Sequence, residues 1–432
     1  MVDVSATVSI EIPAFKGQWL IDAVESVFGQ TSTDWELSIL WDGGDEFARR
    51  VVEELGSLRD PRIQTYLGDR RGIASARRFL TERSRSPWIL TLDDDDVLAP
   101  DAVECFVAAA RATPWAGIVR ARRSFIDADG RDVREADWFP FAERAFQHGM
   151  IRDVFNHSQP ALIRRTAYQR TAGWTGFPEY RNAGEDCDIF VRIEEVAPIE
   201  LLDRVLYAYR LNSRRTSHEL GPEGARDMWR RIADGAIARL GLPLRREGED
   251  PPFSYARLPP APATRDSLEF VIAGDDGAQA TRRSILREGL CDYAIRIVPG
   301  AAAAARNAGF GRCERRIVAF IDAGVELAPG AIDAVLRRFN DGRADCVAQT
   351  DGARRPDSLV VARSEVVRAV GGFDHAFASA SIATRDFFMA ASRRDFSCAL
   401  TADAIAAAPP PLDPPPDDVT RFLAKWRVPV AA

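Results

Sequence analysis

The sequence predicts an α/β protein of two domains, each built on a mostly parallel sheet. Three observations support this prediction. Short apolar strand patterns alternate with helical patterns in the first half of the chain, as in βαβ units. Acidic turns follow two of these strands, and ligands of open α/β sheets bind where the strands end. Part of the first half recurs in the second half, which indicates a duplicated domain.

Composition restricts the functions open to the chain. The 432 residues carry 64 acidic and 57 basic side chains, so a broad basic surface and nucleic-acid binding are not expected. Six widely spaced cysteines without a CxxC pair argue against a disulfide scaffold or a zinc site. No apolar run reaches the roughly 20 residues of a transmembrane segment. We therefore expect a cytoplasmic protein, or one bound peripherally at the inner face of the membrane.

The chain opens as strand, helix and strand. Residues 8–12 alternate as a strand should, and Pro13 is expected to end this strand. Helical spacing then predicts a helix ending near Gly29. A second strand at 35–41 runs into Asp42-Gly43-Gly44, where glycine permits a close approach of backbone and ligand. Asp42 is a candidate binding residue, and the alternative is an Asx turn.

Residues 71–78, Arg-Gly-Ile-Ala-Ser-Ala-Arg-Arg, predict a helix start that carries arginines. An arginine near a helix N-terminus can bind phosphate through two hydrogen bonds, and the helix dipole adds to the attraction. The pattern alone is weak evidence, because a basic amphipathic helix is commonly a solvated surface.

Four aspartates at 93–96 follow the apolar strand at 88–92. Adjacent carboxylates repel one another unless a cation or several backbone N–H groups neutralise them. A divalent metal ion would meet this need. The alternative is an acidic helix start, since Pro100-Asp101 opens a helical pattern.

A helix at 102–112 should lead into strands at 118–121 and 124–126 and a hairpin turn at Asp129-Gly130. Aromatic residues then follow that could stack on sugar rings, with ordinary core packing as the alternative; they are Trp138, Phe139, Phe141 and Phe146.

A second acidic segment, Glu185-Asp186-Cys187-Asp188, opens another helical pattern. Acids in a first helical turn complement the helix dipole, which is the structural alternative. A carboxylate beside a cation and a helix start is also suited to be ionised at neutral pH and to accept a proton.

Taken together, these motifs resemble those of the family 2 glycosyltransferases of GT-A fold. Asp93-Asp94-Asp95-Asp96 resembles the Asp-x-Asp segment of that family, and Pro13-Ala14-Phe15 resembles its Pro-x-(Tyr/Phe) strand end. Gly173-Trp174-Thr175-Gly176-Phe177 and the acids from Glu185 resemble its Gly-Gly-Phe … Glu-Asp-x-Asp block. In the Ala-Arg-Asn segment of the family, Arg78 stands where asparagine is usual.

The resemblance implies a set of site residues. Asp186 would be the general base, next to Glu185. Asp93 and Asp95 would be the motif acids, with Asp95 and Asp96 nearest a Mn²⁺ or Mg²⁺ ion and His218 a further candidate ligand. The residues implied for nucleotide-sugar binding are Pro13, Phe15, Asp42, Arg77, Asp93 and Asp94.

The second half is expected to be a degraded copy of the first. A catalytic domain at 1–245 and a Pro-rich linker at 246–266 precede a copy at 267–408, and a Pro-rich spacer with a tail occupies 409–432. Ala303, Ala305, Arg306, Arg312, Asp322, Leu327, Ala328, Pro329 and Ala331 each repeat a residue that lies 229 positions earlier. The strand at 269–275 is expected to correspond to the strand that ends at Asp42.

Four of the acids are replaced in the copy. Gly324 and Val325 stand where Asp95 and Asp96 would be, and Ala383-Thr384 replaces Glu185-Asp186. We therefore expect a smaller, pseudo-catalytic GT-A-like domain, through which the chain could form a homodimer.

The predicted activity is that of an inverting, metal-dependent glycosyltransferase. It would move a sugar from a nucleotide-diphosphate sugar, with a UDP-sugar favoured, to a hydroxyl acceptor of unknown class, in the biosynthesis of a glycan or glycoconjugate. Two alternatives remain: a sugar-phosphate nucleotidyltransferase, which would release pyrophosphate, and a non-catalytic scaffold that binds sugar nucleotides.

Overall fold

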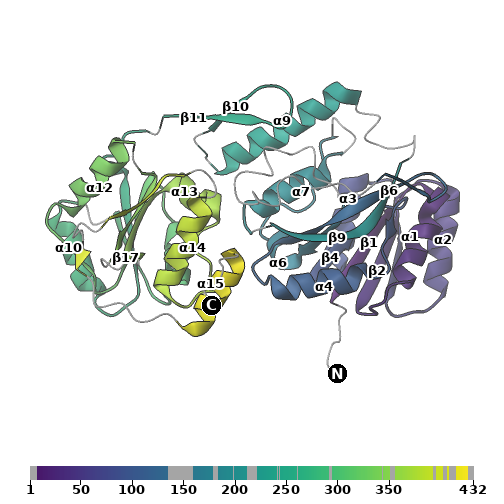
Figure 1. Cartoon of the computed structure of the whole chain (residues 1–432), viewed down its shortest axis with the longest axis horizontal. Coiled ribbons are helices and arrows are strands. Elements are labelled where there is room, and N and C mark those ends of the chain that lie inside the picture. Colours follow the sequence, from purple (N-terminus) through teal and green to yellow (C-terminus); the bar gives the residue numbers. More distant parts are fainter. Residues whose placement is uncertain are drawn as a thin grey trace. The chain divides into compact units, whose positions relative to one another are not determined.

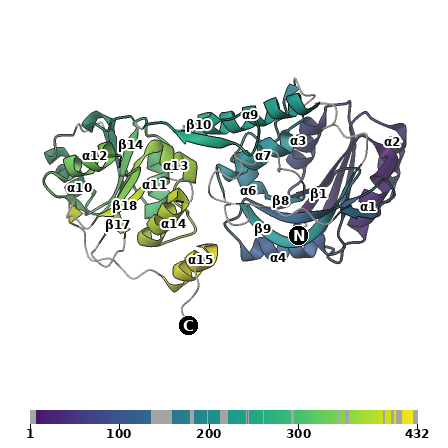
Figure 2. The same cartoon turned by 45° about the horizontal axis from the view of Figure 1, so that its top comes forward.

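The computed structural model divides the chain into two compact units, one of residues 1–236 and 246–254, the other of residues 237–245 and 255–432 (Figures 1 and 2). The structure describes residues 7–134, 159–178, 183–197, 199–211, 221–240, 242, 244–259, 261–290, 294–342, 344–350, 356–392, 396–401, 406–407 and 415–426. The expected linker at 246–266 includes the end of strand β10 (Leu244–Glu247) and all of β11 (Ser254–Arg257), which form a two-stranded sheet. The predicted domain boundaries stay predictions.

The first unit is built on one mixed sheet. Its strand order is β3-β2-β1-β4-β8-β6-β9-β5, with β7 paired to β6. β1 is parallel to β2 and β4, whereas β8 is antiparallel to both β4 and β6. The strands are β1 (Val8–Ala14), β2 (Trp35–Trp41), β3 (Ile63–Leu67), β4 (Trp88–Thr91), β5 (Val97–Leu98), β6 (Ile118–Ile126), β7 (Asp132–Arg134), β8 (Ala161–Arg164) and β9 (Ile199–Arg210).

Helices cover both faces of this sheet. Apolar residues of α1, α2 and α4 pack with Ile39 on one face, and Leu40 packs with Ala76 and Leu80 of α3 on the other, as the alternation of a strand requires. The helical segments are η1 (Gly17–Trp19), α1 (Leu20–Phe28), α2 (Glu46–Ser57), α3 (Ile73–Arg83), α4 (Ala102–Ala112), α6 (Arg165–Tyr168), α7 (Glu185–Glu194) and α9 (Gly221–Leu240).

The strand at 35–41, the helix at 102–112 and the hairpin turn at Asp129-Gly130 are confirmed. Two predictions need correction. β1 continues through Pro13 to Ala14, because the pairing of β1 with β4 ends at Glu11 and the missing N–H of Pro13 interrupts no ladder on that side. The two strands expected between 118 and 126 are one strand, β6, which β9 accompanies along its whole length through two register shifts.

The second unit contains a six-stranded mixed sheet of order β13-β12-β14-β17-β16-β18 and a two-stranded pairing of β15 with β19. Its strands are β12 (Leu268–Ala273), β13 (Ile295–Val298), β14 (Ile317–Asp322), β15 (Glu326–Leu327), β16 (Cys346–Thr350), β17 (Pro356–Arg363), β18 (Cys398–Thr401) and β19 (Ala406–Ala407). Its helices are η4 (Arg265–Ser267), α10 (Ala278–Arg287), α11 (Ala302–Phe310), α12 (Ala331–Asn340), α13 (Ser364–Val370), α14 (Ala380–Ser392) and α15 (Pro416–Trp426).

The order of this sheet repeats β2-β1-β4-β8-β6-β9 of the first unit, strand for strand and direction for direction. β12 lies between β13 and β14, so it corresponds to β1. The match of residues 269–275 with β2 was therefore wrong, because strand position depends on pairing partners and an apolar run ending in aspartate does not reveal them. In the described residues, α2 and β3 have no counterpart in the second unit.

Candidate active site

A buried arginine joins the two acidic segments that the sequence singled out. Arg77 on α3 donates from Nη2 to Oδ1 of Asp93 at 2.7 Å and from Nε to Oε1 of Glu185 at 3.2 Å. Its side chain is 3% exposed. The Arg77 side chain is therefore buried, whereas a side chain that binds phosphate was expected to project from the helix start. Its Nη1 is buried without a hydrogen-bond partner in the described residues.

A glycine determines the backbone conformation at the start of the helix that carries Glu185 and Asp186. Gly184 precedes α7 with a φ of 83°, and a Cβ on it would lie 2.5 Å from the sulfur of Met228 on α9. Both the left-handed conformation and this close contact require glycine. The first turn of α7 can therefore start directly beside Arg77.

The two acids at this helix start have different surroundings. Glu185 is buried, and burial followed by the charge of Asp186 raises its pKa to about 8, against the opposing effect of Arg77. Asp186 is only partly buried, and its Oδ1 accepts a hydrogen bond from the backbone N–H of Cys187 at 2.8 Å. Burial raises the pKa of Asp186 as well. Asp186 is therefore the more accessible of the two carboxylates, and Glu185 is the partner of Arg77.

The aspartate quartet does not act as one cluster. Oδ2 of Asp94 accepts hydrogen bonds from the backbone N–H groups of Phe15 and Lys16, both at 2.7 Å. Burial and the neighbouring Asp95 nevertheless raise the pKa of Asp94 to about 7. Asp94 therefore anchors the loop after β1 to the loop after β4, which is how the Pro13–Phe15 segment reaches the site.

Asp96 has a similar role on the other side of the loop. It is 1% exposed; its Oδ2 accepts from the hydroxyl of Tyr207 at 2.7 Å and its Oδ1 from the backbone N–H of Arg210 at 2.8 Å. Burial and the charges of Asp95 and Asp93 raise its pKa well above the ordinary value. This geometry favours a structural role over the metal contact predicted for Asp96.

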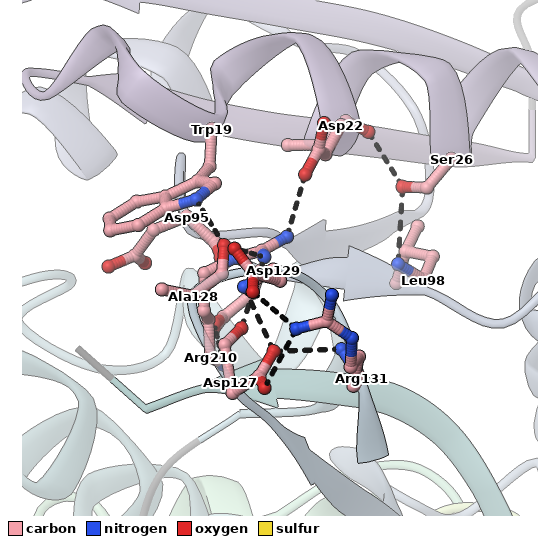
Figure 3. A network of polar contacts seen from close by, with 12 residues as sticks. Trp19, Asp22, Ser26, Asp95, Leu98, Asp127, Ala128, Asp129, Arg131 and Arg210 are labelled. Atoms are coloured by element: carbon pink, nitrogen blue, oxygen red, sulfur yellow. Dashed lines mark hydrogen bonds and ion pairs between the residues drawn. The ribbon is translucent and has the colours of Figure 1, made fainter.

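Arg210, at the end of β9, contacts the loop of residues 93–96, which we call the acidic loop (Figure 3). Its Nε donates to the carbonyl of Asp95 at 2.8 Å, and its Nη2 donates to Oδ2 of Asp22 on α1 at 2.8 Å. Its Nη1 donates to the carbonyls of Asp127 and Ala128 at 3.2 Å. Figure 3 shows the side chain of Asp95 directed away from this guanidinium. Sequence reasoning assigned no role to Arg210 and Tyr207, whose partners Asp22 and Asp96 lie 188 and 111 residues earlier in the chain.

Asp42 is also more buried than predicted. It is 4% exposed, and its two carboxylate oxygens accept the backbone N–H groups of Arg71 and Gly72 at 2.7 and 2.8 Å. It thereby fixes the entry to α3, as the turn alternative implies, and its role in nucleotide-sugar binding stays a prediction. Phe15 remains 37% exposed beside it, with the Arg70 guanidinium 5.5 Å from its ring centre.

The donor set fits a hard divalent cation. Carboxylates of Asp93 and Asp95 are partly exposed, and Mg²⁺ is commonly held by one or two carboxylates together with substrate phosphates. No group of three or more His, Cys, Asp or Glu side chains suited to a metal ion occurs among the described residues. His218 and the aromatic residues from Trp138 to Phe146 lie outside the described residues.

A buried polar chain supports the site. Thr81 on α3 donates to Oε2 of Glu11 on β1 at 2.6 Å and accepts from the indole N–H of Trp174 at 3.0 Å. The carbonyl of Trp174 in turn accepts from Arg78 at 2.6 Å. Burial raises the pKa of Glu11 to about 8. The segment from Gly173 is thus tied to the helix that carries Arg77.

Comparison with known proteins relates part of the first unit to a known family. Residues 9–171 match the family described as Glycosyl transferase family 2. The chain is 28% identical over 237 residues to a chondroitin synthase of Escherichia coli. The matched region covers 54% of this chain and 33% of the synthase. It is 29% identical over 213 residues to a hyaluronan synthase of Pasteurella multocida. That match covers 49% of this chain and 21% of the hyaluronan synthase. The chain thus spans a third or less of the length of these relatives.

A solved mannosyltransferase of Pyrobaculum calidifontis, in complex with GDP-Man and Mn²⁺, is similar at 14% identity with a TM-score of 0.41, covering 57% of this chain and 66% of that one. Among the helices that the structure describes, none combines the length and the apolar character of a membrane span.

Proposed function

We propose that the first unit, which contains a family 2 glycosyltransferase domain at residues 9–171, transfers a sugar from a nucleotide-diphosphate sugar to an acceptor hydroxyl with inversion at the anomeric carbon. The observation that carries this proposal is the bridge made by Arg77. It brings Asp93, on the proposed donor side, and Glu185, next to the proposed base, to a single guanidinium. Positioning a donor, an acceptor and a base is the main demand of this reaction.

On the donor side, Asp93 and Asp95 would hold Mn²⁺ or Mg²⁺. When bound, such an ion neutralises negative charge on a departing diphosphate. Asp94 and Asp96 keep the loop in shape through Phe15, Lys16 and Tyr207, and Arg210 fixes the carbonyl of Asp95. A UDP-sugar is the donor that we favour.

On the acceptor side, Asp186 takes the proton from the attacking hydroxyl. Its partial exposure gives a substrate access, and its raised pKa makes it a stronger base than an ordinary aspartate. Glu185 shares the same helix turn but is committed to Arg77, so it positions rather than reacts. Loss of the proton-accepting carboxylate should therefore stop transfer without removing the donor site.

The second unit is proposed to be a degenerate, GT-A-like copy that lacks this chemistry. Its sheet repeats the strand order of the first unit, and Gly324 and Thr384 stand where Asp95 and Asp186 would be. It would support the first unit or form a homodimer. A cytoplasmic or peripheral inner-membrane location and a role in glycan or glycoconjugate synthesis complete the proposal.

A donor panel tests the function directly. The full chain is incubated with Mn²⁺ and UDP-glucose, UDP-N-acetylglucosamine, UDP-glucuronic acid or GDP-mannose, and release of nucleoside diphosphate is measured with and without a chelator. We expect metal-dependent release from at least one donor, lost in Asp186→Asn and kept in Asp203→Asn, whose carboxylate is 67% exposed. Pyrophosphate release from a nucleoside triphosphate and a sugar phosphate would indicate the nucleotidyltransferase instead. Donor binding without turnover would indicate the scaffold.

A further inference from the structure

Two cysteine thiols meet between neighbouring strands of the second unit, far in sequence from any residue of the proposed site. Cys346 begins β16 and Cys398 begins β18, and the parallel register pairs these two residues directly. The Sγ of Cys346 lies 3.0 Å from the Sγ of Cys398, although 52 residues separate them in the chain. Both are free cysteines.

The backbone holds the two thiols in this arrangement. The carbonyl of Ser397 accepts hydrogen bonds from the N–H groups of Asp345 and Cys346, at 2.7 and 3.2 Å. Oδ2 of Asp345 accepts the N–H of Ser397 at 2.8 Å. Adjacent strands lie about 4.8 Å apart, which is within the roughly 4.4–6.8 Å between Cα atoms that a disulfide tolerates. A bond of ~2.0 Å then requires the sulfur atoms to approach by about 1 Å.

The first unit shows that packing at these two strand positions does not require cysteines. The matching ladder of β6 and β9 begins with the pair Ile118 and Ile199, which are 0% and 1% exposed. Two aliphatic side chains therefore fill the corresponding place in the repeated sheet. The second unit has replaced both members of the pair with thiols.

We propose that Cys346 and Cys398 are a modification site at which a hydroperoxide forms a reversible disulfide. Cys398 is partly exposed, whereas Cys346 is fully buried, so the oxidant reaches Cys398 first. The sulfur of Cys398 attacks the peroxide, breaks the O–O bond and becomes a sulfenic acid, with release of an alcohol from an organic hydroperoxide or of water from hydrogen peroxide. The sulfur of Cys346 then displaces the hydroxyl from that sulfenic acid, and its proton leaves with the hydroxyl as water.

The modification would tie β18, the edge strand of the sheet, to β16. The loop that it closes contains β17, α13 and α14. Because a cross-link across a long loop restricts the unfolded chain, the oxidised protein should be more stable than the reduced one. The proposal does not depend on the function of the first unit.

Mass spectrometry of the full chain tests it. The folded protein is treated with increasing hydrogen peroxide, remaining thiols are blocked with N-ethylmaleimide, and the protein is digested without reduction. We expect one cross-linked peptide joining Cys346 to Cys398, removable by dithiothreitol, at peroxide concentrations that leave Cys105 and Cys313 alkylated. Recovery of Cys346 and Cys398 in separate peptides, alkylated or over-oxidised, throughout the range that spares Cys105 would overturn the proposal.

Two variants serve as controls. Cys398→Ser should give no cross-link and leave Cys346 alkylated. A Cys346→Ile, Cys398→Ile double variant copies the first unit, and its melting temperature should not respond to peroxide, whereas that of the unaltered chain should rise by several degrees. A peroxide-induced rise of the same size in the double variant would contradict the assignment.

Discussion

The two sheets of this chain repeat one strand order, but only the first surrounds its central arginine with acids. In the second unit Arg306 donates to Asp322 at 2.9 Å, as Arg77 does to Asp93. It also donates to the hydroxyl of Thr384 at 2.9 Å, whereas Arg77 donates to the carboxylate of Glu185. An arginine–aspartate pair is therefore part of the shared architecture. The residues that differ between the units, Glu185 and Asp186 above all, are the ones to which the proposed chemistry assigns roles.

The buried residues that support the site also differ between the units: they are polar in the first unit and apolar in the second. The ladder position of Glu11 in β1 is occupied by Val271 in β12, because Glu11 pairs with Thr91 and Val271 with Phe320. Phe320 in turn packs at 5.0 Å, between ring centres, against Phe373, which follows Gly371-Gly372 as Trp174 follows Gly173. The second unit thus has an apolar cluster where the first has a polar chain. A buried polar network that is dispensable for the fold but present beside the site indicates a functional requirement.

Several residues of the acidic loop and its partners differ together in the second unit. Asp96 and its hydrogen-bond partner Tyr207 correspond to Val325 and Ala406, judged from the pairings of β5 with β9 and of β15 with β19. A Cβ on Gly277 would lie 2.7 Å from the Cα of Gly324, so two loops of the second unit meet where the first unit carries Asp95. The concerted change supports a common role for the loop residues.

The largest expected effect separates the two units by activity. Asp186→Asn should lower kcat by about 10²–10⁴-fold, because the variant cannot accept the proton of the acceptor. Thr384→Val, the corresponding change in the second unit, should leave kcat unchanged. Steady-state transfer rates with a donor identified in the panel measure both. A loss of similar size in Thr384→Val would break the comparison.

The next effect is on stability. Arg77→Leu leaves Asp93 and Glu185 without their buried cation and should cost about 3–5 kcal/mol. Arg306→Leu should cost less, because its described partners are one carboxylate, Asp322, and one hydroxyl, Thr384. Urea unfolding measures this cost, with fluorescence reporting the first unit, since eight of the nine tryptophans precede residue 237. Equal fluorescence-detected losses in both variants would argue against separate units.

The buried Glu11 predicts a pH dependence. Its pKa is about 8 in the folded chain against about 4.5 when unfolded, so the folded state holds the proton more tightly between these values. Stability should therefore fall as pH rises from 5 to 8, by up to about 1.4 kcal/mol per pH unit from this group. Glu11→Gln should remove that part of the slope, whereas Val271→Ala should not change it. Identical slopes with and without Glu11 would contradict the assignment.

The smallest effect concerns the loop. Tyr207→Phe removes the hydrogen bond to buried Asp96 and the one accepted from the backbone N–H of Asp93, and it should cost about 1–3 kcal/mol. We also expect a modest rise in the Mn²⁺ concentration needed for half-maximal rate. Tyr209→Phe, on the same strand, is the matched control. A metal requirement unaltered in Tyr207→Phe would show that Asp96 does not shape the loop.

Sequence reasoning found the local patterns and missed the distant partners. The strand before Asp93, the helix start at Glu185 and the repeat were visible because each depends on neighbouring residues. The contacts of Asp94, Asp96 and Asp42 were not, because their carboxylates accept hydrogen bonds from groups that lie 29 to 114 residues away. Arg210 escaped notice for the same reason, since its partner Asp22 lies 188 residues earlier.

Anomalous diffraction at the manganese edge tests the central claim most directly. Crystals of the full chain grown with Mn²⁺ and an accepted nucleotide-diphosphate sugar should show a manganese peak beside Asp93 and Asp95 and none beside Asp322. An equal peak beside Asp322, or an ordered donor in the first unit with no manganese at Asp93 and Asp95, would contradict the account.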